Sequence, residues 1–388
     1  MNEIRERILQ LQPDLIALRH DLHAHPELGF EEHRTAAIVA EWLQKHDIET
    51  LTGVAGTGIA GTLRGEAGEG AVVGFRADMD ALPIEEQNDP PYRSRHVGTM
   101  HACGHDGHTT ILLGAAAVLA QLRAQLRGTV RFYFQPAEEV VSGAQAMLTE
   151  GVLQQMRPRW VVALHGRPGL PLGSIGLRAG VMMASADTFD IWLQGKGGHA
   201  ALPHLAEDPI VASAQLVFAL QTLTSRESDP SDPFVLSVTQ LHAGNTYNVL
   251  PQQAHLAGTV RCLCEETRSR VRRRIEQLVD AVAQAGRLNG RFEWHAGVPA
   301  LRNDEAVVAR IAQVAEESFG SERVIWLKHP LMGAEDFAYF AQEVPAAMFY
   351  LGLGEVADWH NACFDFADGA IAPGVEMLVR LALSELCT

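Results

Sequence analysis

Apolar runs that end abruptly in charged or polar residues constrain the fold of this chain more than any other feature. They cover residues 71–77, 129–134 and 160–164, and they are followed by Asp78 and Asp80, by Glu138 and Glu139, and by His165. Helical patterns separate the runs. Short apolar strands that alternate with helices predict an α/β fold with a mostly parallel sheet and helices on both faces. Polar residues just beyond the carboxyl ends of such strands are candidate site residues.

The rest of the pattern agrees with this fold class. Apolar residues at helical spacing predict an amphipathic helix over 3–22, and a second helix is expected around 31–45. Residues 107–124 indicate a buried helix and 305–319 a further helix. A last strand is predicted at 346–351, and His360 follows it.

Three histidines and a cysteine lie within the eight residues from His101 to His108. If this segment is extended, side chains two apart face the same way, so His101, Cys103 and His105 converge on one point. Thiolate and imidazole suit zinc or a similar divalent ion. The alternative for any single histidine is that it caps the following helix or faces solvent.

The two adjacent glutamates after the second run can divide a hydrolytic task. One of Glu138 and Glu139 can bind a metal ion while the other is the general base that activates water. The alternative is a solvated helix start. Asp80 is equally well explained as a turn or cap residue, and that explanation fits Asp78 less well.

From about residue 181 the pattern changes to that of an inserted α+β domain. Its strands are expected near 188–193, 234–240, 255–263 and 291–296, with helices near 206–224 and 267–286. Polar and apolar residues alternate in the first strand, which indicates a sheet with one wet face. An exposed sheet edge invites pairing, so dimerisation through this insert is a hypothesis.

Three polar residues of the insert are further candidates. His199 lies in a glycine-rich loop, and Asn248 and Arg261 lie near strand ends. Taken singly, each is more often structural than functional.

Composition excludes several classes of function. The chain has 388 residues, about two domains on the usual length prior, and a formal net charge of −16, which opposes binding to nucleic acid or to an anionic membrane. We expect no secretory signal and no membrane span, and hence a soluble cytoplasmic protein. Five cysteines without a Cys-x-x-Cys pair argue against a disulfide framework.

Ten ordered segments together resemble the metal-dependent amidohydrolase branch of the aminoacylase and carboxypeptidase-G superfamily, which includes hippurate hydrolases and auxin-conjugate hydrolases. The resemblance covers essentially the whole chain. The segments are HPELGFEE from His25, RADMDALP from Arg76, MHACGHDGHT from Met100, QPAEE from Gln135, LHGRP from Leu164, ASADTF from Ala184, GKGGHAALPH from Gly195, NVLP from Asn248, GTVR from Gly258 and GAEDF from Gly333. Val140-Val141-Ser142 and Ala334 depart from the family pattern, which leaves the shape of the substrate pocket open.

The resemblance implies a catalytic domain, formed by residues 1–182 and 298–388, that carries two divalent metal ions. Zinc or manganese is expected, with cobalt or nickel as alternatives. A ferredoxin-like α+β lid and dimerisation domain interrupts it at residues 183–297, so a homodimer is implied. The implied metal ligands are Cys103, His105, Glu139, His165 and His360.

The resemblance also assigns roles around the ligands. Glu138 is the implied general base, and Asp78 falls where relatives orient a ligand. His199 corresponds to a lid histidine that reaches the partner subunit's site and stabilises the oxyanion. Asn248 and Arg261 correspond to lid residues near the substrate, where Arg261 can bind a carboxylate.

The implied reaction is hydrolysis of an N-acyl amino acid to a carboxylate and a free amino acid. A dipeptidase or aminopeptidase of the same superfamily is the closest alternative. Two rivals from other classes remain open at this point: hydrolysis by a Cys103 nucleophile without metal, and a non-catalytic protein that binds metal or acyl amino acids.

Overall fold

The computed structural model describes residues 2–387. The chain divides into two compact units, and each is described by itself. Residues up to 182, 302–329 and from 336 onward form the larger unit, and residues 183–301 with 330–335 form the smaller one. Within the described residues, no helix is both long enough and apolar enough to cross a membrane.

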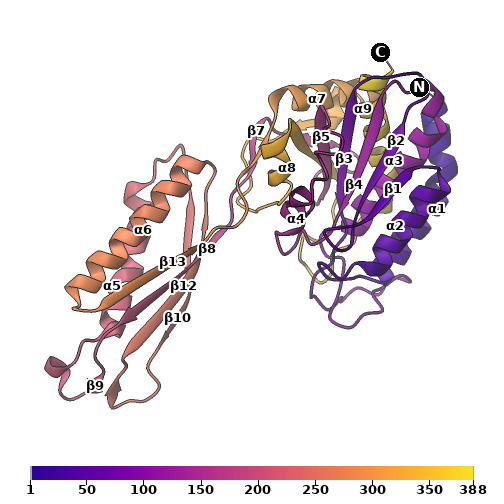
Figure 1. Ribbon diagram of the computed structural model, residues 1–388. Coiled ribbons are helices and arrows are strands. Elements are labelled where there is room, and N and C mark those ends of the chain that lie inside the picture. Colours follow the sequence, from indigo (N-terminus) through magenta and orange to yellow (C-terminus); the bar gives the residue numbers. More distant parts are fainter. Residues whose placement is uncertain (1, 388) are drawn as a thin grey trace. The chain divides into compact units, whose positions relative to one another are not determined.

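An eight-stranded mixed sheet, in the order β1-β2-β4-β3-β5-β16-β6-β15, organises the larger unit (Figure 1). Parallel pairing joins β4 to β3, β3 to β5, β5 to β16, and β6 to β15, whereas β1, β2 and the β16–β6 pair run antiparallel. The strands are β1 (Glu49–Val54), β2 (Gly58–Arg64), β3 (Val72–Asp78), β4 (Thr129–Gln135), β5 (Trp160–Arg167), β6 (Ile175–Leu177), β15 (Val324–Trp326) and β16 (Ala346–Gly352). Two short strands, β7 (Gly180–Met183) and β14 (Leu301–Asn303), form a separate ladder.

Helices pack on both faces of this sheet. Helix α3 contacts β3, β4 and β5, and α1 lies against α3 and α9. The short helices α4 and α8 contact each other and the strands β4 and β16. The helices of this unit are α1 (Asn2–Ala24), α2 (His33–Lys45), α3 (His105–Gln121), α4 (Gly143–Thr149), α7 (Glu305–Phe319), α8 (Ala338–Glu343) and α9 (Ile371–Leu386).

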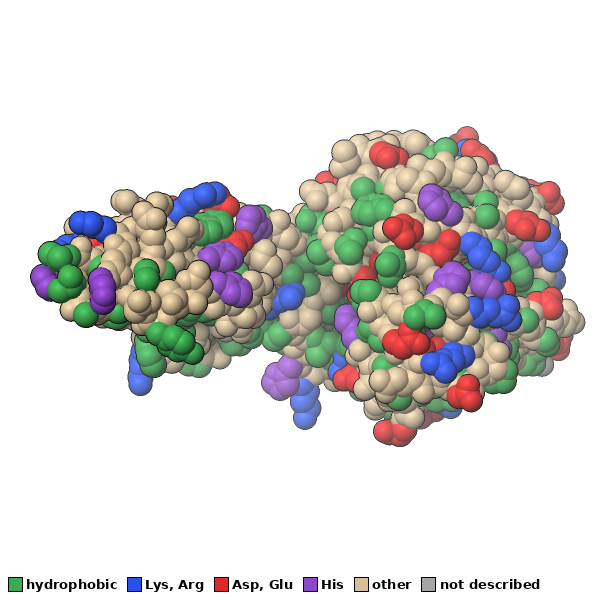
Figure 2. All heavy atoms as spheres, turned by 90° about the horizontal axis from the view of Figure 1, so that it is seen from below, with side chains coloured by type: hydrophobic (Ala, Val, Ile, Leu, Met, Phe, Trp, Pro, Cys, Tyr) green, Lys and Arg blue, Asp and Glu red, His purple; other side chains and the backbone are tan. Residues whose placement is uncertain are grey.

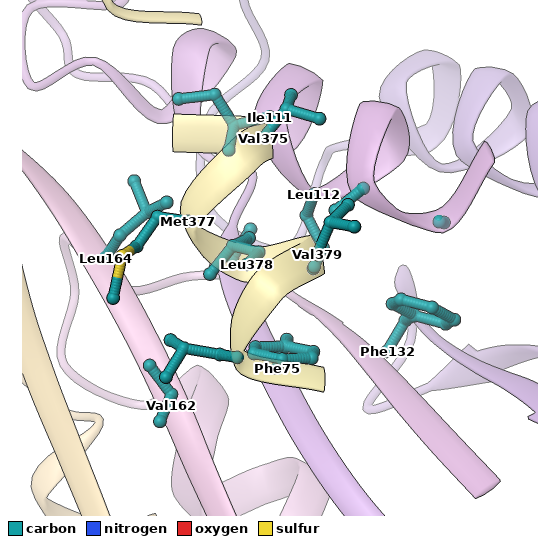
Figure 3. Close-up of a cluster of buried hydrophobic side chains, with 14 of the residues drawn as sticks. Phe75, Ile111, Leu112, Phe132, Val162, Leu164, Val375, Met377, Leu378 and Val379 are labelled. Atoms are coloured by element: carbon teal, nitrogen blue, oxygen red, sulfur yellow. The ribbon is translucent and has the colours of Figure 1, made fainter. Parts of the chain in front are cut away.

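The core of the larger unit forms between α3, α9 and the central strands. Figure 3 shows Met377 and Leu378 of α9 beside Leu164 and Val162 of β5, with Phe75 of β3 next to the same helix. All five side chains are at most 2% exposed. Every residue of β4 is likewise buried, as the apolar runs in the sequence predict.

The smaller unit is a four-stranded antiparallel sheet in the order β10-β12-β8-β13, with two helices. Its βαββαβ order of elements is ferredoxin-like. Helices α5 and α6 contact each other, and their apolar residues share one core with the inner face of the sheet. The elements are β8 (Asp187–Gln194), α5 (Pro209–Thr222), β10 (Val235–Ala243), β12 (Gln253–Arg261), α6 (Glu265–Ala285) and β13 (Asn289–His295), with a separate ladder of β9 (Gly198–His199) and β11 (Val249–Leu250).

The predicted fold class is confirmed: a mostly parallel α/β unit is interrupted by a smaller α+β unit. The elements that the sequence did not predict include β1, β6, β15, α4, α8 and α9. It also did not show that β1 and β2 are antiparallel to their neighbours, because the apolar run of β2 resembles that of a buried parallel strand.

Candidate metal centre

The polar residues that follow β3, β4 and β5 lie at one edge of the larger sheet. Strand β3 lies between β4 and β5 and runs parallel to both. Their carboxyl ends therefore meet at the same edge. This edge brings together Asp78 at the end of β3, the glutamate pair Glu138 and Glu139 after β4, and His165 near the end of β5.

A tight turn before α3 delivers Cys103 and His105 to the same edge. Gly104, between them, has φ 97°, a left-handed conformation that favours glycine. A Cβ at this position would lie 2.9 Å from the ring of Phe366. His105 is the first residue of α3 and is fully buried, and Cys103 is 7% exposed.

The potential ligand atoms form overlapping groups whose members lie within 4.8 Å of one another. Cys103 Sγ lies 3.4 Å from His165 Nε2, and His360 Nε2 lies 3.3 Å from Glu139 Oε2. Three of these groups contain the expected ligands: Cys103 with His105 and His165, Cys103 with Glu139 and His360, and His105 with Glu138 and Glu139. Two others are Asp78 with His105 and His108, and Glu138 with Glu335 and Asp336. The structure thus gathers all five residues that the resemblance implies as ligands, together with Glu138.

His360 reaches the cluster from a loop after β16. Its backbone N–H donates to the carbonyl of Ala102, 2.8 Å away, which fixes the loop against the segment that carries Cys103. Its φ is 59°, uncommon for a residue with a side chain. The His360 side chain is 55% exposed, so it stands at the rim of an otherwise buried cluster.

The glutamate pair stands on a strained turn. Ala137 has φ 54°, a conformation that persists only when its surroundings hold it. Its N–H donates to Glu32 Oε1 at 2.8 Å, and Thr57 donates to the other oxygen of Glu32. A buried carboxylate on the segment before α2 therefore fixes the turn that presents Glu138.

Two aspartates hold the histidines around the cluster. His105 Nδ1 lies 3.2 Å from Asp80 Oδ1, and the second oxygen of Asp80 accepts from the backbone N–H of Glu139 at 2.9 Å. His108 Nδ1 donates to Asp78 at 2.7 Å, and its Nε2 accepts from the N–H of Gly166, next to His165. Such partners orient ligands. In this structure Asp80 contacts Nδ1 of His105, whereas Asp78 orients the site mainly through its hydrogen bond with His108.

Burial and crowded acidic groups shift the proton affinities of the cluster. Burial, with Glu139 and Glu138 close by, raises the pKa of the Cys103 thiol well above its usual value. Burial also raises the pKa of Glu139, to about 7. For His105, burial by itself lowers the pKa, but Asp78 and Asp80 outweigh it and raise the pKa to about 10. These shifts favour the protonated forms of Cys103, Glu139 and His105, and a bound cation would displace their protons.

The cluster fits a pair of divalent cations. Tetrahedral zinc would hold a thiolate and an imidazole nitrogen about 3.6 Å apart, and the corresponding Cys103–His165 separation is 3.4 Å. Two buried atoms, His105 Nε2 and Glu139 Oε1, lack a hydrogen-bond partner among residues 2–387. A mixed set of thiolate, imidazole and carboxylate donors suits zinc, manganese and similar ions. Cation binding would release the protons held on Cys103, His105 and Glu139.

The structure differs from expectation at His101. The chain turns at Gly104 instead of continuing as an extended segment, so His101 joins none of the ligand groups found among the described residues. It is 1% exposed, neither of its ring nitrogens has a hydrogen-bond partner in the part of the chain that the structure describes, and burial lowers its pKa to about 4. His101 is therefore a neutral core histidine.

The candidate residues of the insert lie at two ends of its sheet. His199 on β9 is exposed and pairs with Val249 of β11, directly after Asn248. Strand β12 begins three residues after β11, and Arg261 is its last residue. At about 3.3 Å per residue, the two ends of β12 are about 26 Å apart. Within one insert, His199 and Asn248 are thus close together and Arg261 is far from both.

Sequence reasoning gave no supporting role to three residues beside the cluster, Glu32, His108 and Arg76, although His108 was one of the histidines in the candidate segment. Arg76 is fully buried and donates to Gln135, Asp78 and Asp336. The sequence signal for Arg76 was a charged residue inside the apolar run of β3. The signal for His108 was its position one helical turn after Gly104, and Glu32 offered none.

Comparisons with known proteins extend over the whole chain. Residues 74–384 match the description "Peptidase family M20/M25/M40". An N-acetylcysteine deacetylase of Bacillus subtilis is 38% identical over 375 residues, which cover 96% of this chain and 97% of that protein. A hippurate hydrolase of Campylobacter jejuni is 37% identical over 386 residues and covers both chains completely. A crystal structure of a Bacillus subtilis protein, described as a dinuclear metal binding peptidase of the M20 family, superposes with a TM-score of 0.85 at 34% identity and covers 97% of this chain and 99% of that one.

Proposed function

The chain belongs to peptidase family M20/M25/M40, and on that premise we propose that it is a metal-dependent amidohydrolase of N-acyl amino acids. The substrate is cut at the amide bond to a carboxylate and a free amino acid. The N-acetyl and hippurate substrates in the names of its relatives motivate this class. The observation that carries the proposal is the position of Glu138, whose Oε2 lies 3.9 Å from His105 Nε2, beside the five candidate ligands.

Each residue of the cluster has a role in the proposed reaction. Cys103, His105, Glu139, His165 and His360 hold two divalent cations, which we propose to be zinc or manganese. When bound, the cations polarise an amide carbonyl and make hydroxide available from water near neutral pH. Asp80 holds the ligand His105, and Asp78 holds His108, whose Nε2 accepts from the N–H of Gly166 beside the ligand His165.

Glu138 moves the proton. As general base it removes a proton from the attacking water, and as general acid it delivers that proton to the departing amine. A second carboxylate beside the ligand Glu139 suits this role, and a protein that only bound acyl amino acids would not need it. A Cys103 nucleophile is disfavoured, because burial and the two glutamates raise the pKa of its thiol and oppose the reactive thiolate.

A homodimer formed through the insert, residues 183–297, completes the proposal. Phe218 and Val211, seven residues apart on α5, are 79% and 55% exposed, and Leu241 of the edge strand β10 is 45% exposed. Figure 2 shows hydrophobic side chains on the surface of this unit. Exposed apolar groups next to the free edge of a sheet favour association with a second copy.

The dimer would supply the site with residues from two inserts. Strand β12, whose ends are about 26 Å apart, runs from near the β9–β11 ladder that carries His199 to Arg261, and this length exceeds that of a small N-acyl amino acid. Arg261 of one subunit binds the substrate carboxylate, while the partner subunit's His199 stabilises the oxyanion and Asn248 lies beside it. We place the enzyme in the cytoplasm, with residues 1–182 and 298–388 as its catalytic domain.

The test compares substrates and one pair of variants. N-acetyl, N-benzoyl and indole-acetyl amino acids are assayed against dipeptides, with protein stripped by EDTA and restored with zinc or manganese. Glu138→Gln is expected to lower kcat by about 10²- to 10⁴-fold, the contribution of a positioned proton-transfer group, with two cations still bound. Glu139→Gln, the same change one residue along, is expected to lose a cation.

Three results would contradict the proposal. Faster hydrolysis of dipeptides than of N-acyl amino acids would favour the peptidase alternative. Activity that persists without cations would exclude the metal mechanism. Loss of both cations from Glu138→Gln would show that Glu138 is a ligand and not the base.

A further inference from the structure

One arginine of the N-terminal helix joins two separate segments of the metal centre. Arg19 of α1 is fully buried, and its Nε donates to Asp106 Oδ2 at 2.9 Å. Its Nη2 donates to Asp365 Oδ1. Asp106 directly follows His105, and Asp365 lies on the loop that carries His360. The guanidinium therefore spans the two segments.

The surroundings of Arg19 fix its orientation. The ring of Tyr92 lies 4.7 Å below the guanidinium carbon, and the Tyr92 hydroxyl donates to the second oxygen of Asp365 at 2.7 Å. His23, one helical turn along α1, lies 2.8 Å from the same Asp106 oxygen that Arg19 binds. A planar fork with several donors can bind two carboxylates at fixed angles, whereas the point charge of a lysine cannot.

The loop with His360 is the ligand segment that most needs such support. His360 is 55% exposed and adopts a left-handed conformation. The loop is tied to the segment before α3 by the hydrogen bond from His360 N to Ala102 O and by the packing of Phe366 against Gly104. The Asp365 contact to Arg19 adds a partly buried ion pair at the far end of the same loop.

We propose that Arg19 is a positioning residue of the metal centre. By binding Asp106 and Asp365 together, it fixes the separation between His105 and His360 and thereby the affinity for the cation that His360 binds. The inference rests on the metal centre of the proposed function.

Asp365 offers the cleanest perturbation. Arg19→Lys risks unfolding, because it leaves the buried Asp106 incompletely paired. Asp365 is 37% exposed, so Asp365→Asn removes the charge without leaving a deeply buried orphan. Asp365→Glu keeps the charge and serves as the conservative variant. Asp21→Asn is the matched control, because Asp21 of α1 also binds an arginine but contacts neither ligand segment.

The measurement is zinc release from protein loaded with two equivalents, followed with a chromophoric chelator. We expect two release steps in the wild type. In Asp365→Asn the cation released in one step should bind up to about 10-fold more weakly, the low end of the effect of removing a direct partner of a ligand, because Asp365 acts through Arg19. The cation released in the other step should bind as in the wild type. Asp365→Glu should recover part of the loss, and Asp21→Asn should match the wild type.

The outcomes separate this inference from the function it rests on. Zinc release from Asp365→Asn that matches the wild type would overturn the positioning role. An equal loss of zinc affinity in both steps would also overturn it, because general destabilisation does not distinguish the two cations. A wild type that binds fewer than two zinc ions would overturn the proposed metal centre and this inference with it.

Discussion

A buried histidine close to the metal centre predicts how stability depends on pH. His23 lies between two carboxylates, with Nδ1 2.8 Å from Asp106 and Nε2 3.4 Å from Glu86. Burial by itself lowers its pKa, but hydrogen bonds to these two groups outweigh the burial and raise the pKa from 6.5 to about 9. The imidazole is therefore charged at neutral pH in the folded protein. His23→Gln removes that charge.

The size of the effect follows from the shift. Each pKa unit corresponds to about 1.4 kcal/mol, so the charged form stabilises the fold by about 3 kcal/mol. Because the folded pKa is the higher one, this contribution is complete below about pH 6.5 and is lost as the pH rises through about 9. We expect about 2 kcal/mol to remain at about pH 7.5.

The assay is urea unfolding of wild type and His23→Gln at several pH values, with chelator present so that cations do not contribute. The difference in the free energy of unfolding should shrink by about 3 kcal/mol between about pH 6 and pH 9.5. His46→Gln is the control, because burial lowers the pKa of His46 and its difference should not shrink as the pH rises. A constant difference for His23→Gln would show that the folded protein keeps this histidine neutral.

Two further predictions concern the ligand shell and the insert. Asp80→Asn should weaken cation binding by about 10- to 100-fold, since Asp80 contacts both His105 and the backbone of Glu139; unchanged zinc affinity in a chelator titration would contradict this. Phe218→Asp should convert the proposed dimer to a monomer in size-exclusion chromatography with light scattering, whereas Leu9→Asp, at a side chain that is 62% exposed on the larger unit, should not. A dimer that survives Phe218→Asp would place the interface elsewhere.

The sequence predicted those parts of the fold where one signal dominates. Continuous apolar runs identified β3, β4 and β5, because strands buried on both faces tolerate few polar residues. The polar residues after them were recognised as site candidates because the ends of parallel strands share one sheet edge. The helix over 305–319 agrees with α7 to the residue, since apolar residues recur along it at helical spacing and Asp304 caps it.

The supporting residues of the site were harder to predict. Arg19 follows Leu15 by four residues and precedes Leu22 by three, so helical spacing places it next to the apolar stripe, and both Arg19 and His23 are fully buried. Their partners, such as Asp365, lie far away in sequence, so the local pattern does not show which groups they bind. Sequence spacing likewise does not determine which aspartate binds His105. In the structure the side-chain directions bring Asp80 to His105 and Asp78 to His108.

The charges around the cluster indicate that the site is formed before any cation binds. Arg76 ties Asp78 to Asp336 on one side, and Arg19 ties Asp106 to Asp365 on the other, all through contacts within the chain. The Arg19 pairs join the segments that carry His105 and His360, and the Arg76 pairs support the neighbouring end of β3. Binding to such a site costs less ordering of the chain than metal binding that is coupled to folding. Removal of the cations should therefore abolish activity while the fold persists, so that restored zinc or manganese finds the same five ligands in place.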